Sequence, residues 1–172
     1  MLGVKVLIWK PHLPFPTSPL LGTAWPSPSV AARCNLHSAK RGNPFKQDAP
    51  VEECNCGVHA LSALWMLQYY IYGVVQVNAE QESHQMFVCL LEASGKVILH
   101  ETGWRAAAVD VIGVCSFPQE LPDRQAFHLA YQAASHFNVP ILNFSELSDV
   151  LTWSYQKSHK SVKAESELER LF

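Results

Sequence analysis

Residues 86–114 read MFVCLLEASGKVILHETGWRAAAVDVIGV, and this stretch decides the fold class. It is rich in β-branched and apolar residues, and two short segments that contain glycine, 92–95 and 102–103, interrupt it. This pattern predicts three antiparallel strands, joined by a hairpin turn at 92–95 and a second tight turn at 102–103. A small antiparallel sheet is therefore expected in the middle of the chain.

Upstream of this stretch, residues 57–71 (GVHALSALWMLQYYI) are apolar around nearly the whole circumference of a helix, which predicts a buried helix. Residues 4–9 (VKVLIW), which are mostly β-branched or apolar, predict a first strand. Eight of the eleven prolines lie in residues 1–50, and each of them fixes φ and removes a backbone donor. This lead segment is therefore expected to be irregular, with Trp25 anchoring it on the core.

Downstream, residues 122–137 predict an amphipathic helix. Its apolar stripe consists of Ala126, Leu129, Ala130, Ala133, Ala134 and Phe137. The Asn-Val-Pro segment at 138–140 is expected to end this helix, residues 141–142 predict a short edge strand, and a last helix is expected from Ser145 to about Gln156. Together these elements predict an α+β fold with a sheet of three to five strands, the buried helix, and two later helices over one face.

The composition favours one compact domain. The chain has 172 residues, of which 48% are apolar and 16% charged. We expect a proline-rich lead at 1–50 packed on the core, a single α+β domain at 51–157 and a charged tail at 158–172. No apolar run approaches the ~18 residues that span a bilayer, and the apolar block before Lys10 is too short for a signal peptide. A cytoplasmic protein without a membrane partner is therefore expected.

The charge balance disfavours nucleic acid as a partner. The formal net charge is −2 and the pI is about 6.4, whereas phosphate binding needs clustered Lys and Arg. Four basic residues do lie in the proline-rich lead, namely Arg33, Lys40, Arg41 and Lys46. Four basic residues are weak evidence for a nucleic-acid-binding surface, so the expected partner is a small ligand or a protein.

Cysteine and histidine spacing points to a zinc site. Cys34 and His37 form a C-x-x-H pair, and Cys54 and Cys56 form a C-x-C-G knuckle that begins seventeen positions after His37. Three thiolates and one imidazole make a full tetrahedral set for zinc. His59 is an alternative fourth ligand, although a hydrogen bond from its ring to a carbonyl is favoured.

The remaining two cysteines, Cys89 and Cys115, lie among apolar neighbours in the expected strands. Free cysteine is among the most buried residue types, so both are expected to be small core residues. An odd number of cysteines in a chain without a secretory signal argues against a disulfide framework.

A second hypothesis uses the same thiol for catalysis. At the N-terminus of the expected helix, Cys56 would be activated by the helix dipole, as in cysteine-dependent hydrolases and transferases. His100 is the candidate base, with Glu101 or Asp110 to orient it. The metal and nucleophile roles of Cys56 exclude each other.

The turn after residue 99 is a candidate ligand-binding surface. His100, Glu101, Trp104 and Arg105 place an imidazole, a carboxylate, an indole and a guanidinium within six residues. Such a set can bind a small anionic or planar ligand, with Arg105 as a forked donor. Alternatively, Arg105 and Glu101 pair with each other across the turn.

Two strings carry a resemblance to a known family. Residues 54–61 (CNCGVHAL) and 95–106 (GKVILHETGWRA) resemble the C-x-C-G-x-[His/Tyr]-A and G-x-V-x-x-H-x-x-G-x-R-A motifs of small uncharacterised actinobacterial and phage proteins. Residues 137–140 (FNVP) are similar to a later segment of that family. The resemblance covers about residues 24–150.

The resemblance implies a bacterial or phage protein and assigns no activity. The positions that coincide with family motifs are Cys34, Cys54, Cys56, His100, Gly103 and Arg105. Family members carry a histidine just before the Ala-Pro that precedes C-x-C, and this chain has Gln47 before Asp48-Ala49-Pro50, so His37 substitutes as the fourth ligand. The expected function is a zinc-stabilised binding or regulatory module, and the alternative is the enzyme that uses Cys56 and His100.

Overall fold

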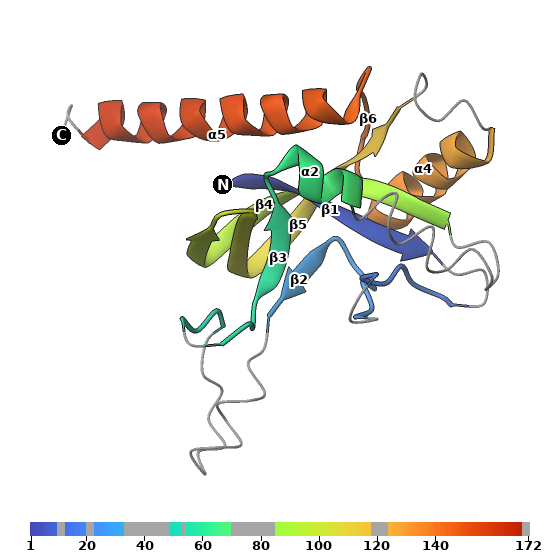
Figure 1. Ribbon diagram of the computed structural model, residues 1–172, viewed down its shortest axis with the longest axis horizontal. Coiled ribbons are helices and arrows are strands. Elements are labelled where there is room, and N and C mark those ends of the chain that lie inside the picture. Colours follow the sequence, from blue (N-terminus) through green and yellow to red (C-terminus); the bar gives the residue numbers. More distant parts are fainter. Residues whose placement is uncertain are drawn as a thin grey trace, which may run out of the picture.

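The computed structural model describes residues 1–9, 13–19, 23–32, 49–52, 54–69, 85–117 and 124–169. Within these residues, six strands form one sheet and three helices pack around it (Figure 1). The predicted α+β class with a small, mainly antiparallel sheet is confirmed. None of the described helices is both long enough and apolar enough to cross a bilayer.

Two long strands, β4 (Gln85–His100) and β5 (Gly103–Ser116), form the central antiparallel hairpin. They are joined by the tight turn expected near residue 102. The hairpin turn expected at 92–95 is wrong, because β4 runs through this segment as one strand. Gly95, with φ +71°, lies instead in a register shift between Ser94 and Val97. Such a β-bulge accommodates extra residues without reversing the chain.

The remaining strands extend this hairpin into a closed circuit. β1 (Leu2–Trp9) pairs with β4, β3 (Val58–Leu61) pairs with β5, and the two meet at the pair Val4–Leu61. The order β5–β3–β1–β4 therefore returns to β5. The first strand expected at 4–9 is confirmed, and it is a central strand of the sheet.

Two short strands add to β5 outside this circuit. β2 (Ser29–Ala31) pairs antiparallel with β5, and β6 (Ile141–Asn143) pairs parallel with it. The short strand expected at 141–142 is therefore confirmed.

The buried helix expected over 57–71 is wrong in its first part. Val58 and Ala60 are buried and alternate with half-buried His59 and Leu61, which is the period of a strand. Only α2 (Leu64–Gln68) is helical in the part of this segment that is described. An apolar run does not distinguish the two structures, and the hydrogen bonds that β5 offers decide for the strand here.

The two later helices are confirmed, but the expectation that they cover one face is wrong, because their buried residues belong to different core clusters. α4 (Arg124–Phe137) packs against β4 and β5, and it ends at Asn138, where φ is +55°. α5 (Leu147–Glu169) packs against β1 and α2. It begins close to Ser145, as expected, and it continues beyond Gln156 through most of the charged tail expected at 158–172.

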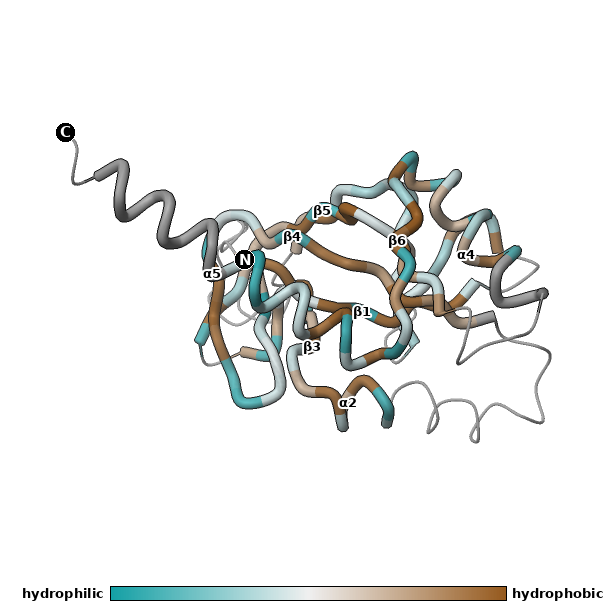
Figure 2. The backbone as a smooth tube through the Cα atoms, turned by 90° about the horizontal axis from the view of Figure 1, so that it is seen from above, coloured by the Kyte–Doolittle hydropathy of each residue, from teal (hydrophilic) through white to brown (hydrophobic). Residues whose placement is uncertain are grey.

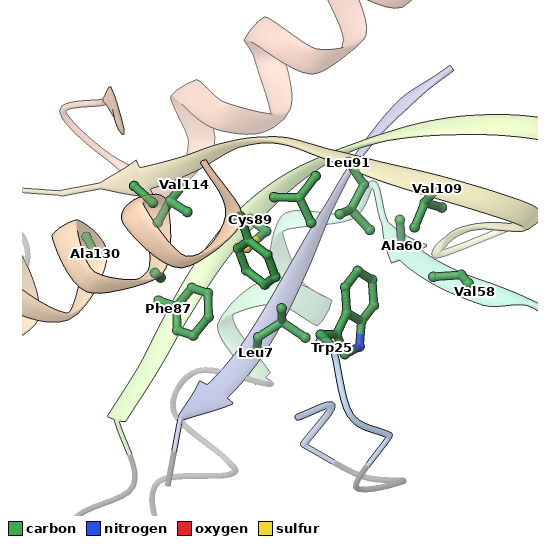
Figure 3. Packing of buried hydrophobic residues seen from close by; sticks show 14 of the residues in the cluster. Leu7, Trp25, Val58, Ala60, Phe87, Cys89, Leu91, Val109, Val114 and Ala130 are labelled. Atoms are coloured by element: carbon green, nitrogen blue, oxygen red, sulfur yellow. The ribbon is translucent and has the colours of Figure 1, made fainter. Parts of the chain in front are cut away.

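The buried side chains form two clusters on opposite faces of the sheet. Alternate residues of β1 and β4 belong to different clusters, as Val6 and Leu7 show. The first cluster lies between the sheet and α4 and includes Trp25, which is 1% exposed (Figure 3). The second lies on the side of α5 and α2. Figure 2 shows the apolar colour along β1, β4 and β5, which both clusters share.

Candidate functional site

The C-x-C loop is held against β5 by one buried arginine. Arg105, 8% exposed, donates from Nη1 to the carbonyl oxygen of Cys56 and from Nη2 to that of Glu52, at 3.1 Å each. Gly57 has φ +124°, and a Cβ at this position would lie 3.1 Å from the Cβ of Arg105. The close approach and the positive φ both favour glycine directly after the knuckle. The loop therefore has a defined backbone conformation.

The environment of the Cys56 sulfur suits a metal-binding thiolate. Both knuckle cysteines are half-buried. The Val51 N–H donates to Cys56 Sγ at 3.2 Å, and the carbonyl of Val51 accepts a hydrogen bond from the Cys54 N–H at 3.1 Å. An N–H directed at sulfur stabilises the thiolate, which is the form that binds metal ions. These residues thus fit a thiophilic ion.

The other two proposed ligands, Cys34 and His37, lie outside the described residues. Within the residues that are described, no group of three or more His, Cys, Asp or Glu side chains is placed to hold a metal. His59 directs Nε2 to the carbonyl oxygen of Asn55 at 3.0 Å, as favoured by the sequence. The complete ligand set therefore stays a prediction.

One argument for catalysis by Cys56, its position at the N-terminus of a helix, does not hold in the structure. Cys56 precedes the strand β3, and the next helix in the described part of the chain begins at Leu64, so no helix dipole acts on this thiol. Nδ1 of His100 lies 3.2 Å from Oγ1 of Thr102, within hydrogen-bond distance. Asp110 accepts a hydrogen bond from Ser29 Oγ, at the β2 end of the sheet, and does not orient His100.

The expected ligand surface at residues 100–105 is only partly exposed. His100 and Glu101 face solvent. Trp104 is 2% exposed, and its indole N–H donates to the carbonyl oxygen of Leu2 at 3.0 Å. The Arg105 guanidinium bonds to the knuckle carbonyls rather than to Glu101. Trp104 and Arg105 are thus interior residues, and their acceptors lie in β1 and in the C-x-C loop, which the sequence could not reveal.

A second imidazole joins His100. The ring centroids of His59 and His100 lie 6.0 Å apart, with an angle of 48° between the planes. Burial lowers the pKa of His59, and the charges of Lys5, His100 and Arg105 lower it further, although the hydrogen bond to Asn55 opposes them. The sequence hypothesis treated His59 and His100 separately, since nothing in the chain order indicates that β3 and β4 converge on β5.

Lys5 is a further residue that the sequence hypothesis missed. Its Nζ donates to the carbonyl oxygen of His59 at 3.0 Å and lies 5.7 Å from the centroid of the Trp25 ring. Burial lowers the pKa of Lys5 to about 8. The sequence feature that could have indicated this residue is a lysine in the middle of an apolar strand, between Val4 and Val6.

Comparisons of the chain with protein-family models, with curated proteins and with solved structures find no match.

Proposed function

We propose that this protein is a zinc-stabilised binding module, in which Cys54 and Cys56 bind the ion together with Cys34 and His37. The observation that carries the proposal is that hydrogen bonds fix the backbone of the C-x-C loop before any ion binds. Arg105 holds its backbone through two carbonyls, and a backbone N–H is directed at Cys56 Sγ. A loop organised in this way reduces the entropy lost when an ion is bound.

The chemistry of the donor set favours zinc over harder cations. Thiolate and imidazole donors select zinc or another thiophilic metal, whereas magnesium and calcium take oxygen ligands. A structural zinc ion would supply folding free energy to the segment of the lead that carries Cys34 and His37. In this proposal the ion connects the lead with the β3–β5 pairing, and the exposed side of the turn at His100 receives the ligand.

Metal content and cobalt spectra test the proposal. Protein purified without added metal should contain about one zinc per chain by elemental analysis. Replacement of zinc by Co²⁺ should produce a thiolate-to-metal absorption band that weakens in Cys54→Ser, Cys56→Ser and Cys34→Ser. Cys115→Ala is the matched control, because this thiol lies in the core. A stable protein with zinc near zero would overturn the proposal, as would a cobalt band that these serine variants leave unchanged.

The same purified protein also distinguishes the zinc proposal from its alternative, a cysteine-dependent hydrolase or transferase. That alternative expects iodoacetamide to label Cys56 rapidly, with a pH midpoint well below the ~8.5 of a free thiol, and expects loss of this reactivity in His100→Gln. The zinc proposal expects Cys54 and Cys56 to be protected together, and to become reactive together after chelation.

The proposed setting is the cytoplasm of a bacterium or a phage-infected bacterium, where thiols remain reduced. This setting rests on the resemblance of residues 54–61 and 95–106 to the actinobacterial and phage family. The proposed partner is a small ligand or a protein, and the net charge of −2 argues against nucleic acid.

A further inference from the structure

Four basic side chains surround the pairing of β3 with β5. His59 of β3 lies directly opposite Arg105 of β5, and His100 of β4 lies opposite Gly103. Because Gly103 has no side chain, the two imidazoles face each other diagonally across β5, with their centroids 6.0 Å apart. Lys5 of β1 lies on the opposite face of the sheet, where its Nζ donates to the backbone carbonyl of His59.

Within the described part of the chain, these four groups bond to neutral partners rather than to carboxylates. The Arg105 guanidinium and the Lys5 ammonium both donate to backbone carbonyl oxygens. The histidines contact the Asn55 carbonyl and the Thr102 hydroxyl. A neutral acceptor satisfies a hydrogen bond and leaves the charge uncompensated. The low exposure of Arg105, 8%, makes its field stronger than that of a surface arginine.

Each ring has one nitrogen that these contacts leave available. The carbonyl oxygen of Asn55 can only accept, so His59 donates to it from Nε2. This leaves Nδ1 of His59 for a ligand. His100 contacts Thr102 through Nδ1, which leaves Nε2. His100 is exposed and His59 half-buried, so a ligand can approach both from solvent.

We propose that the His59 and His100 rings, beside the Arg105 guanidinium, bind a small tetrahedral oxyanion, either free phosphate or the phosphoryl group of a small molecule. Two imidazole rings and one guanidinium offer N–H donors to an oxyanion, and a tetrahedral oxyanion has several oxygens that can accept from them. This inference deepens the proposed function by naming the ligand of the binding module. It does not require the zinc ion.

Neighbouring charges act on the His59 ring. His59 Nδ1 donates to an anion only when the ring is protonated, and the nearby charges of Lys5, His100 and Arg105 oppose that protonation. A bound oxyanion compensates these charges. Glu101, which is exposed beside His100, is the carboxylate that opposes the anion.

Histidine-ring NMR tests the inference. Full-length protein with ¹³C-labelled histidine is titrated at pH 6 with inorganic phosphate, at ionic strength held constant with NaCl. The ring signals of His59 and His100 should shift and saturate as phosphate is added. A parallel titration with methyl phosphate separates the two sources, because a site for a phosphoryl group binds the ester as well as the free ion.

Three variants make the result specific. His100→Gln, at an exposed position, should lower the phosphate affinity about tenfold, the loss of one charge-assisted hydrogen bond. Glu101→Gln should raise it about twofold, and His128→Gln, on the exposed side of α4, should leave it unchanged. Unaltered binding in His100→Gln would overturn the inference, as would an equal response to acetate or to NaCl alone. Zinc content separates the two proposals, since a zinc-containing protein that ignores phosphate contradicts only this one.

Discussion

Lys5 demonstrates at the scale of one residue how the surroundings set the chemistry of a side chain. It lies on β1 between Val4 and Val6, which belong to the second core cluster, so its own side chain points toward the first cluster. There its ammonium group donates to the His59 carbonyl beside the Trp25 ring. Burial lowers its pKa from 10.5 to about 8, with Cys89 opposing the shift.

The lowered pKa predicts a stability that rises with pH. Between pH 8 and 10 the unfolded chain retains the Lys5 proton and the folded chain releases it, so deprotonation favours folding. The free energy of unfolding should increase by about 2 kcal/mol over this range. Urea denaturation at several pH values measures it. Lys5→Met should lose this increase, whereas an equal slope in that variant would mean that other groups cause it.

At the scale of elements, the end of α4 shows how local backbone conformation stops a helix. Asn138 has φ +55°, the Val139 N–H donates to the Ala134 carbonyl at 3.0 Å, and the Asn138 N–H donates to that of Ser135 at 3.2 Å. These two bonds form a Schellman motif, which satisfies carbonyls that the helix itself leaves unpaired. Pro140 follows and prevents the helix from resuming.

The left-handed conformation of Asn138 predicts opposite effects of two substitutions. Asn138→Gly should maintain or raise the free energy of unfolding by up to about 1 kcal/mol, since glycine adopts positive φ without a Cβ clash. Asn138→Val should lower it by about 1–2 kcal/mol, because a β-branched residue is strained there. Chemical denaturation followed by circular dichroism measures both. A tolerated valine would show that the helix end relaxes.

At the scale of the whole molecule, the two core clusters and the C-x-C loop are separate sources of stability. The clusters bury side chains of the closed strand circuit, α4 and α5, and they contain no residue of the loop. Arg105 connects the loop to the circuit through two hydrogen bonds to backbone carbonyls. Loss of an ion from the loop should therefore weaken the protein without dismantling the sheet.

Chelation tests this separation. A strong zinc chelator should lower the Tm by about 10 °C. This is the loss expected for an ion whose dissociation constant lies well below the free ion concentration. The far-ultraviolet circular dichroism of the sheet should persist below the new Tm. Cys56→Ser should start from the lower Tm and show no response to chelator. A parent protein whose Tm is insensitive to chelation would contradict a structural ion.

Features that depend on local pattern were correctly predicted from the sequence. They include the strand at 4–9, the amphipathic helix over 122–137 with its stop at 138–140, and the burial of Cys89 and Cys115. Each depends on side-chain periodicity or on the backbone preference of a few neighbouring residues, and both are present in the chain before it folds.

Other features were decided only by tertiary structure. Residues 58–61 are a strand rather than a helix because β5 offers them a ladder of hydrogen bonds, and Gly95 makes a bulge rather than a turn because β4 remains paired on both sides of it. The approach of His59 to His100 and the use of Arg105 on the knuckle carbonyls depend on strands that are distant in sequence. An apolar run or a charged side chain carries its own propensity, and the partner that satisfies its hydrogen bonds is chosen only when the sheet closes.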